Sequence, residues 1–281
     1  MCYNHNKLLP STNTNEQYME GIMEDLLKVK DNTYVVMGVA NNRSIAWGVA
    51  ESLFKAGAKV IFTYRQERSK KKLERLLEEN GYEAELIVQC DVNSDESIKN
   101  AFTKIGEVSG QIAGVVHSVA FANMEDLRAD FVNTSRDGYA FAQDTSAYSL
   151  IAVAREAKPL MKEGGSIVAM TYLGAERAIE GYNVMGVAKA ALESSVKYLA
   201  LDLGKYGIRV NAISAGAIRT LAAKGVPSFN DILHIIEERS PLKRNVTKEE
   251  VGDMTLVMLS HLSRGVTGEI VYVDSGYHIV G

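Results

Sequence analysis

The chain has 281 residues, of which 46% are hydrophobic and 23% charged, as expected for a globular domain with a large core. Its formal net charge of −4 gives no general attraction to nucleic acid or to an anionic membrane. No apolar run has the length of a membrane span, and the two cysteines, Cys2 and Cys90, argue against a disulfide framework and show no metal-ligand spacing. We therefore expect a cytoplasmic protein with no metal, no nucleic-acid partner and no membrane insertion.

Residues 1–30 differ in composition from the rest of the chain. They are polar, rich in asparagine and without hydrophobic periodicity, so we expect a flexible leader. Residues 31–281 alternate short apolar runs with helix-length segments, and no linker interrupts them. We expect one domain over residues 31–281.

Seven apolar runs within this domain predict β-strands. They cover residues 34–38, 59–64, 85–90, 112–117, 166–170, 208–213 and 269–273. Nearly continuous apolar strands are typical of a parallel sheet that is covered on both faces. The predicted fold is α/β: a single doubly wound, Rossmann-type domain with a seven-stranded parallel sheet and helices on both faces.

The turn after the first run is a candidate pyrophosphate site. The run ends at Gly38, and Ser44 is a suitable N-cap for a helix that would end before Gly57. Free N–H groups at such a helix start suit a phosphate. Only Gly38 and Gly48 are present, without the G-x-G-x-x-G spacing, so a tight turn with a small packing residue is equally open. The place in the first βα unit favours dinucleotide binding.

The residues at the ends of the next three runs indicate which cofactor the domain would bind. Arg65 follows the second run, where NAD-selective sites usually carry an acidic residue, and this favours NADPH over NADH. A solvated helix start is the alternative. Asp91, after the third run, could contact an adenine amino group or cap a helix. His117, at the end of the fourth run, fits a packed structural histidine better than a catalyst.

Tyr182 and Lys189 are separated by seven positions at the start of a helical stretch rich in alanine and leucine. Seven residues make nearly two turns, so the two side chains would share one helix face about 10 Å apart along its axis. A nearby ammonium lowers the pKa of a phenol, which predicts a tuned proton donor. Most isolated pairs of this kind are ordinary surface residues, but the nucleotide-binding pattern before this pair favours catalysis.

These motifs together resemble the short-chain dehydrogenase/reductase superfamily, and within it the bacterial enoyl-acyl-carrier-protein reductases of fatty-acid synthesis. The run around Arg65 is most similar to the staphylococcal branch, which the resemblance associates with NADPH. The resemblance covers residue 31 to the C-terminus, although Ala217 stands where many members carry proline. The matching segments are residues 38–48, 90–92, 117–122, 171–174, 182–189, 211–220 and 273–277.

The resemblance implies roles for individual residues. Tyr182 would hydrogen-bond the thioester carbonyl and its developing enolate, Lys189 would bind the nicotinamide ribose, and Tyr172 would flank the acyl chain. Ala122 would contact the substrate. The residues implied to contact NADPH or NADH are Gly38, Ser44, Ile45, Arg65, Asp91, Val92, Val119, Lys189, Ile218, Arg219, Thr220, Leu221 and Ala222. The family also implies a homotetramer.

The seven-residue separation of Tyr182 and Lys189 in the sequence has a chemical rationale. In a ketoreductase, hydride and proton go to adjacent atoms, and ordinary superfamily members space their tyrosine and lysine four positions apart. In a 2-enoyl thioester, hydride goes to C3 while charge develops on the C1 oxygen, so a longer spacing favours enoyl reduction. A carbonyl (3-ketoacyl) reductase and a non-catalytic NAD(P)H-sensing protein of the same fold are the alternatives.

Residues 219–238 are predicted to form a mobile lid over an acyl channel, because Gly225 and Pro227 interrupt an apolar helical pattern. Phe229 and Ile232 are candidate channel walls, and a surface helix packed on the sheet is the alternative. Four nearby cations could face an acidic acyl carrier protein or merely solvent. These cations are Arg219, Lys224, Lys243 and Arg244.

Overall fold

The computed structural model describes residue 21, residues 26–220 and residues 229–280. One seven-stranded sheet has the order β3-β2-β1-β4-β5-β6-β7, and every neighbouring pair is parallel. The predicted fold is confirmed, and each predicted strand boundary lies within two residues of the observed one. The strands are β1 (Thr33–Met37), β2 (Lys59–Tyr64), β3 (Leu86–Gln89), β4 (Gly114–His117), β5 (Gly165–Thr171), β6 (Ile208–Ala215) and β7 (Ile270–Val273).

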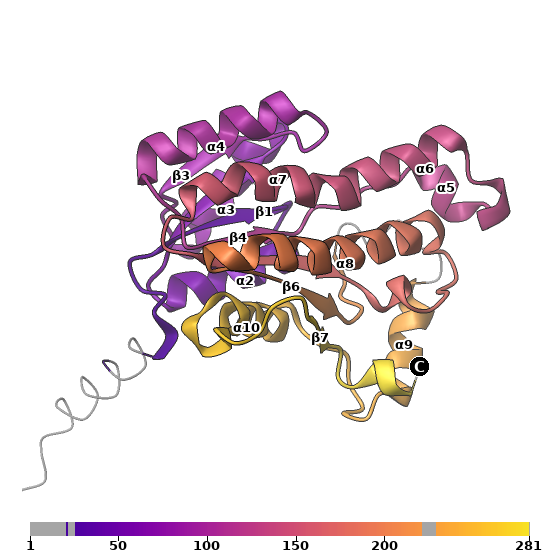
Figure 1. The fold of residues 1–281 in the computed structure, drawn as a ribbon. Coiled ribbons are helices and arrows are strands. Elements are labelled where there is room, and N and C mark those ends of the chain that lie inside the picture. The colour runs from indigo at the N-terminus through magenta and orange to yellow at the C-terminus, as the bar shows by residue number, and fades with distance from the viewer. Residues whose placement is uncertain (1–20, 22–25, 221–228, 281) are drawn as a thin grey trace, which may run out of the picture.

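Helices cover both faces of this sheet. In Figure 1, α4, α7 and α8 lie on one side of the strands, and α2 and α10 lie on the other. Successive strand residues therefore enter different cores: Val35 packs in the α4–α7–α8 core and Val36 in the α2–α10 core. The helices are α2 (Ile45–Lys55), α3 (Glu67–Asn80), α4 (Asp95–Ser109), α5 (Met124–Arg128), α6 (Arg136–Gln143), α7 (Ser149–Ala157), α8 (Asn183–Leu203), α9 (Phe229–Arg239) and α10 (Lys248–Leu259).

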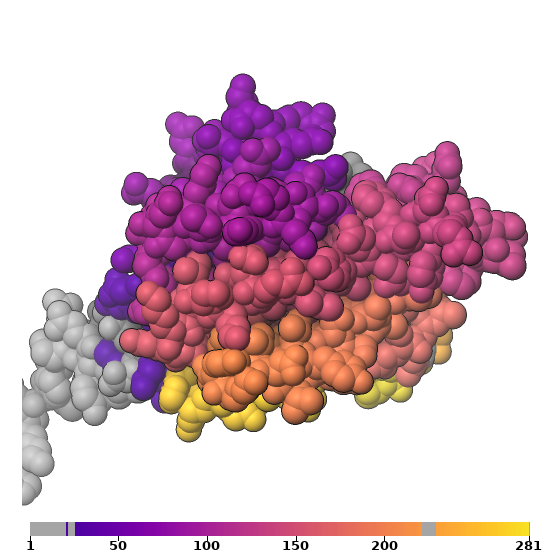
Figure 2. Space-filling view, turned by 45° about the horizontal axis from the view of Figure 1, so that its top comes forward, coloured from indigo at the N-terminus to yellow at the C-terminus, as the bar shows by residue number. Residues whose placement is uncertain are grey.

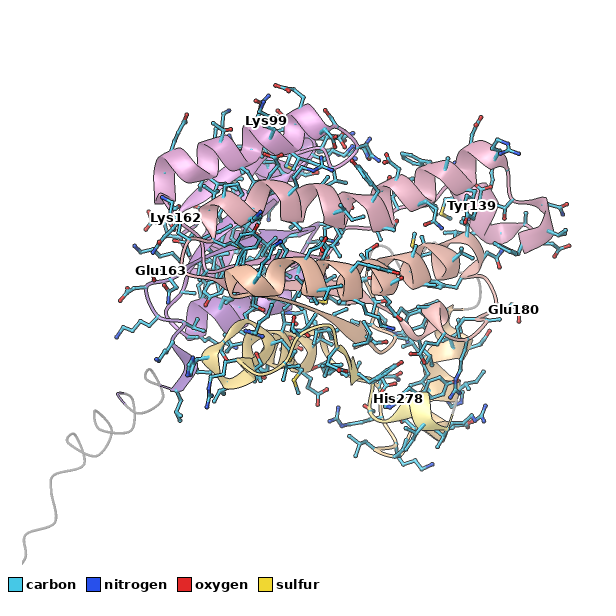
Figure 3. All side chains as sticks on the ribbon, in the orientation of Figure 1. Lys99, Tyr139, Lys162, Glu163, Glu180 and His278 are labelled. Atoms are coloured by element: carbon cyan, nitrogen blue, oxygen red, sulfur yellow. The ribbon has the colours of Figure 1, made fainter. Side chains whose placement is uncertain are left out.

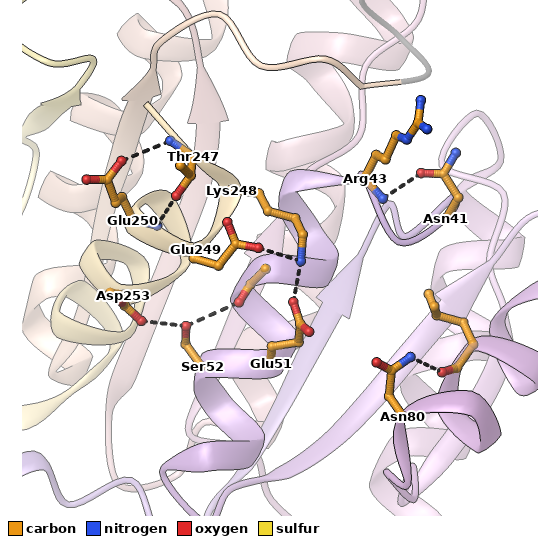
Figure 4. A network of polar contacts seen from close by, with 12 residues as sticks. Asn41, Arg43, Glu51, Ser52, Asn80, Thr247, Lys248, Glu249, Glu250 and Asp253 are labelled. Atoms are coloured by element: carbon orange, nitrogen blue, oxygen red, sulfur yellow. Dashed lines mark hydrogen bonds and ion pairs between the residues drawn. The ribbon is translucent and has the colours of Figure 1, made fainter. Parts of the chain in front are cut away.

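Helices α2 and α10 cross at two glycines. A Cβ atom on Gly252 would lie 2.4 Å from the Gly48 carbonyl oxygen, so neither helix has room for a side chain there. Polar contacts flank the crossing (Figure 4): Lys248 pairs with Glu51, and Ser52 Oγ donates to Asp253 at 2.8 Å. This close packing fixes α2, whose N-terminus follows the turn after β1.

Because the strands are parallel, their carboxyl ends all lie on one side of the sheet, which we call the carboxyl edge, and their amino ends lie on the other. Figure 3 shows Glu180 and His278, which lie beyond the carboxyl ends of β5 and β7, on the side opposite Lys162 and Glu163, which precede β5. The end of the molecule formed by α5 and α6 projects from the body on the carboxyl side (Figure 2). The order of the sheet reverses at β1 and β4, and dinucleotides bind beyond the carboxyl ends of the strands at such a point.

Among the described residues, no helix is both long and apolar enough to cross a lipid bilayer.

Candidate active site

Two predicted catalytic tyrosines lie in contact beyond the carboxyl end of β5. The rings of Tyr172 and Tyr182 form an edge-to-face pair with centroids 4.9 Å apart. A Cβ atom on Gly174 would lie 2.4 Å from Tyr182 Cδ1, and one on Gly186 would lie 2.7 Å from the Gly174 carbonyl oxygen. The Tyr182 ring is therefore held between Tyr172 and backbone that only glycine permits.

Lys189 lies buried on α8 and is hydrogen-bonded to the end of β5. Its Nζ donates to the Met170 carbonyl oxygen at 2.7 Å. An ammonium has three donors, so this bond leaves capacity for a ligand hydroxyl. Burial lowers the pKa of Lys189 to about 8, and the nearby Glu193 carboxylate opposes that shift. The side chain is placed to bind a group at the carboxyl edge of the sheet.

The expected lowering of the Tyr182 pKa by Lys189 is wrong. Burial raises the pKa of the Tyr182 phenol, and the neighbouring Tyr172 and Glu193 raise it further. The Lys189 ammonium is instead bonded to a backbone carbonyl. Tyr182 also lies just outside α8, which begins at Asn183. The Tyr182 hydroxyl is therefore a neutral hydrogen-bond donor at physiological pH.

A second contact between α8 and β5 involves Glu193, one turn after Lys189. Thr171 Oγ1 donates to Glu193 Oε1 at 2.6 Å, beside the Lys189 bond to Met170. Burial raises the pKa of the Glu193 carboxyl. Two adjacent residues of β5 thus fix the helix that carries Lys189, and they directly precede Tyr172.

The turn after β1 has the form expected of a phosphate-binding loop. Gly38 has φ +94°, and a Cβ atom there would lie 2.0 Å from the Ser118 carbonyl oxygen, so glycine is required. Ser44 occupies the N-cap position of α2, as predicted, but its side chain does not cap the helix. Its Oγ instead accepts from the N–H groups of Ala40 and Asn41 at 3.0 and 3.1 Å. Ser44 therefore shapes the loop and leaves the first N–H groups of α2 available.

Arg65 and Asp91 lie together beyond β2 and β3. Arg65 Nε is 3.4 Å from Asp91 Oδ2, and the Arg65 side chain is 53% exposed. Asp91 also accepts from the Asn93 N–H at 3.1 Å. The alternative role of Asp91 as a helix cap is wrong, because Ser94 caps α4 by accepting from the Ser97 N–H.

The other sequence-predicted contacts lie along the same edge. Val92 and Ala122 are buried, Ile45 and Val119 are half-buried, and Ala122 packs with Tyr182. Ile218, Arg219 and Thr220 follow β6 at its carboxyl end. Leu221 and Ala222 lie outside the described residues, so no contact with the rest of the site can be assigned to them.

His117 is a buried structural histidine, as predicted. Ser149 Oγ donates to the Thr145 carbonyl at 2.7 Å and must therefore accept from His117 Nε2, 2.8 Å away. The proton is on Nε2, and Nδ1 has no partner among the described residues. Burial, with Lys189 nearby, lowers the pKa of His117 to about 3. The ring is neutral and is not placed to act as a base at physiological pH.

The predicted lid is described only in part. Helix α9 packs its buried face, with half-buried Phe229 and Ile232, near Ala217. A cavity of about 420 Å³ lies between residues 217–219 and α9, but neither Phe229 nor Ile232 lines it. Gly225 and Pro227 lie outside the described residues. The lid and its channel walls therefore remain predictions.

Of the four cations predicted to form a basic group, Arg244 is paired. Both of its terminal nitrogens contact the Glu250 carboxylate. Lys243 Nζ donates to the Glu238 carbonyl at 2.7 Å, and Arg219 donates to Asn230. Lys224 lies outside the described residues. The charge available to an acidic partner is therefore smaller than the sequence suggests.

Two side chains that anchor loops of the site were not predicted from the sequence. Asn183, with φ +37°, donates to the carbonyl of Ala129 at 2.7 Å and so joins the start of α8 to the end of α5. Ser146 bonds to the backbone of Phe121. No sequence motif marks either residue, although asparagine is a favoured residue at positive φ.

The described residues fit a dinucleotide. Gly38 allows close approach to the backbone, α2 offers N–H groups, and Lys189 offers unused donors. Within the described ranges, no group of three or more His, Cys, Asp or Glu residues could hold a metal ion.

Comparisons with known proteins agree with this geometry. The family model described as enoyl-(acyl carrier protein) reductase matches residues 38–278. An NADPH enoyl-(acyl-carrier-protein) reductase of Staphylococcus aureus strain MRSA252 is 62% identical over 91% of this chain and 100% of its own length. An NADH enzyme of Bacillus cereus is 59% identical over 90% of this chain and 99% of its own length.

Solved structures give the same result. The structure of the Bacillus cereus enoyl-acyl carrier protein reductase with NADP⁺ and indole naphthyridinone superposes with a TM-score of 0.88 at 59% identity, over 90% of this chain and 98% of that one. The Aquifex aeolicus NADH enzyme gives a TM-score of 0.86 at 43% identity, over 90% of this chain and 98% of that one. The chain belongs to the enoyl-acyl-carrier-protein reductase family.

Proposed function

We propose that this protein reduces the C2=C3 double bond of trans-2-enoyl thioesters carried on acyl carrier protein, in fatty-acid elongation. The observation that carries the proposal is the Tyr172–Tyr182 pair, which packs on Gly174 beyond the carboxyl end of β5, the strand end to which Lys189 is bonded. Family membership supports the reaction class, and the pair supplies the donor that it needs.

In the proposed mechanism, Tyr182 acts on the thioester oxygen. Burial keeps its hydroxyl protonated, so it can donate a hydrogen bond to that oxygen as negative charge develops there. Donors aimed at such a charge typically contribute about 10²–10³ in rate. The nicotinamide cofactor supplies the hydride when it is bound. Lys189 binds and orients the nicotinamide ribose, and Tyr172 packs against the Tyr182 ring and borders the acyl chain.

For the cofactor itself we propose NADPH in preference to NADH. Arg65 Nε faces Asp91, which leaves the two terminal nitrogens of the guanidinium for a 2′-phosphate. Charge-assisted hydrogen bonds contribute about 1.5–3 kcal/mol each, which corresponds to roughly 10- to 150-fold in affinity. The neighbouring Gln66 is neutral, so the preference rests on one cation.

The cofactor proposal is tested with Arg65→Ala. We expect kcat/KM for NADPH to fall at least tenfold while the value for NADH changes little. An equal fall in kcat/KM with both cofactors, or a wild-type preference for NADH, would show that Arg65 does not bind the 2′-phosphate. Lys59→Ala serves as a control, because Lys59 begins the same strand at its amino end and is exposed.

The reaction is tested by following NADPH absorbance at 340 nm with crotonyl and 3-ketoacyl thioesters. We expect oxidation of NADPH with the crotonyl substrate only. Faster reaction with the 3-ketoacyl substrate would instead identify a carbonyl reductase. NADPH binding without turnover of either substrate would identify a sensor.

The remaining proposals concern organisation and setting. We infer a homotetramer, which is supported by large apolar side chains on the outer face of α8: Tyr198 is 71% and Leu201 77% exposed. Light scattering should give four chain masses, and a single chain mass would refute this. We further propose a cytoplasmic enzyme, with residues 1–30 as a leader and residues 31–281 as the reductase domain.

A further inference from the structure

Helices α6 and α7 are joined by a π-helical turn, η2 (Asp144–Tyr148). Such turns are rare and occur frequently at functional sites. The hydroxyl residues Thr145, Ser146 and Ser149 in and after this turn are buried, and each bonds to a group outside it or across it. The turn therefore uses its polar side chains for tertiary contacts at the carboxyl edge of the sheet.

Ser146 holds the loop that follows β4. The Phe121 N–H donates to Ser146 Oγ at 3.0 Å, and the same hydroxyl donates to the Phe121 carbonyl at 3.1 Å. One side chain thus satisfies both backbone groups of Phe121, as a neighbouring strand would. Ala122, the predicted substrate contact, is the next residue and packs with Tyr182.

Thr145 holds the loop that follows β3. Asn93 Nδ2 donates to Thr145 Oγ1 at 2.7 Å and to Asp144 Oδ2 at 3.1 Å. The Asn93 N–H also donates to Asp91, which faces Arg65. The same turn is therefore bonded to the loop at the proposed adenosine end of the cofactor.

We propose that η2 is the common anchor of these two loops, with Ser146 positioning the substrate side and Thr145 positioning the cofactor side. This inference rests on the proposed function, since it assigns Ala122, next to the residue that Ser146 holds, to the enoyl substrate and the loop after β3 to NADPH. The two hydroxyls bond to Asn93 and to the backbone of Phe121, and not to Tyr172, Tyr182 or Lys189, among the described residues. Each acts through the loop backbone or the asparagine that it holds.

The experiment separates the two sides by kinetics and binding. Ser146→Ala leaves both polar groups of Phe121 without a partner, so we expect the KM for crotonyl thioester to rise about tenfold. The Kd for NADPH, measured by its fluorescence, should stay within about twofold of wild type. Thr145→Val removes one hydroxyl at nearly constant volume and should raise the NADPH Kd about fivefold, with the crotonyl KM little changed.

Ser195→Ala is the matched control. Ser195 Oγ donates only within α8, to the Ala191 carbonyl at 2.8 Å, so its loss should change neither constant. If Ser146→Ala does not fold, Ser146→Cys is measured instead, because it keeps a weak donor and should raise the KM about threefold.

A folded Ser146 variant with wild-type KM, or two variants that alter both constants in parallel, would overturn the inference. Wild-type protein without enoyl reduction would refute the proposed function instead. The NADPH Kd of Thr145→Val would still test the cofactor side in that case.

Discussion

Replacement of Lys189 by methionine should make the protein more stable at neutral pH while removing productive cofactor binding. The lysine is buried with one hydrogen bond to the Met170 carbonyl, and burial lowers its pKa from 10.5 to about 8. At pH 7 the folded state must therefore keep an ammonium in a site that disfavours it. Functional residues commonly carry such a cost.

The magnitude follows from the pKa of Lys189. A fall from 10.5 to about 8 corresponds to about 3 kcal/mol of free energy of unfolding that the wild type lacks at pH 7. The substitution also leaves the Met170 carbonyl without its partner, at a cost of about 1–2 kcal/mol. Lys189→Met should then be more stable than wild type by about 1–2 kcal/mol at pH 7.

The pH dependence gives the sharper test. Between pH 8 and 10.5 the unfolded lysine still binds a proton that the folded one has lost, so the wild type gains stability as pH rises. Relative to Lys189→Met, it should gain about 3 kcal/mol between pH 7 and 10.5. Urea unfolding of both proteins over this range measures the difference, and Lys197→Met, an exposed residue of the same helix, is the control. A difference that is independent of pH would refute the reasoning.

Three further predictions concern the packing of α2 on α10, the start of α8 and the N-terminal leader. Gly252→Ala places a Cβ atom 2.4 Å from the Gly48 carbonyl and should lower the free energy of unfolding by about 1–3 kcal/mol in urea titrations, whereas Gly204→Ala, with open space around it, should change little. Asn183→Asp replaces the amide donor by a carboxylate against the carbonyls at the end of α5, and kcat should fall about tenfold; unchanged kcat would exclude a positioning role. Deletion of residues 1–22 should leave the melting temperature and turnover nearly unchanged, and a large loss of either would mean that the leader is part of the folded enzyme.

The sheet could be predicted from the sequence because its central strands are buried on both faces. The run Lys59–Tyr64 has the apolar segment 60–62 at its centre, and that pattern does not depend on distant residues. The alternation of strands and helices along the chain also places Gly38 after β1 and Tyr182 and Lys189 after β5. Arg65 and Asp91 meet for a similar reason, because β2 and β3 are neighbours and end at one edge.

The remaining features depend on contacts between distant parts of the chain. The sign of the Tyr182 pKa shift is set by burial, and the spacing to Lys189 carries no information about burial. Ser44 satisfies the cap pattern but uses its hydroxyl for the preceding loop. The bond of Ser146 to Phe121 joins residues 25 positions apart, and no local pattern distinguishes it from an ordinary buried serine.

The most direct test of the account is the effect of Tyr182→Phe on the reduction of crotonyl thioester by NADPH. The substitution removes the hydroxyl and keeps the ring that packs on Tyr172 and Gly174. We predict that kcat falls by about 10²–10³ while the NADPH Kd and the melting temperature stay at wild-type values. Retention of the wild-type kcat would contradict the claim that the Tyr182 hydroxyl stabilises the developing charge on the thioester oxygen.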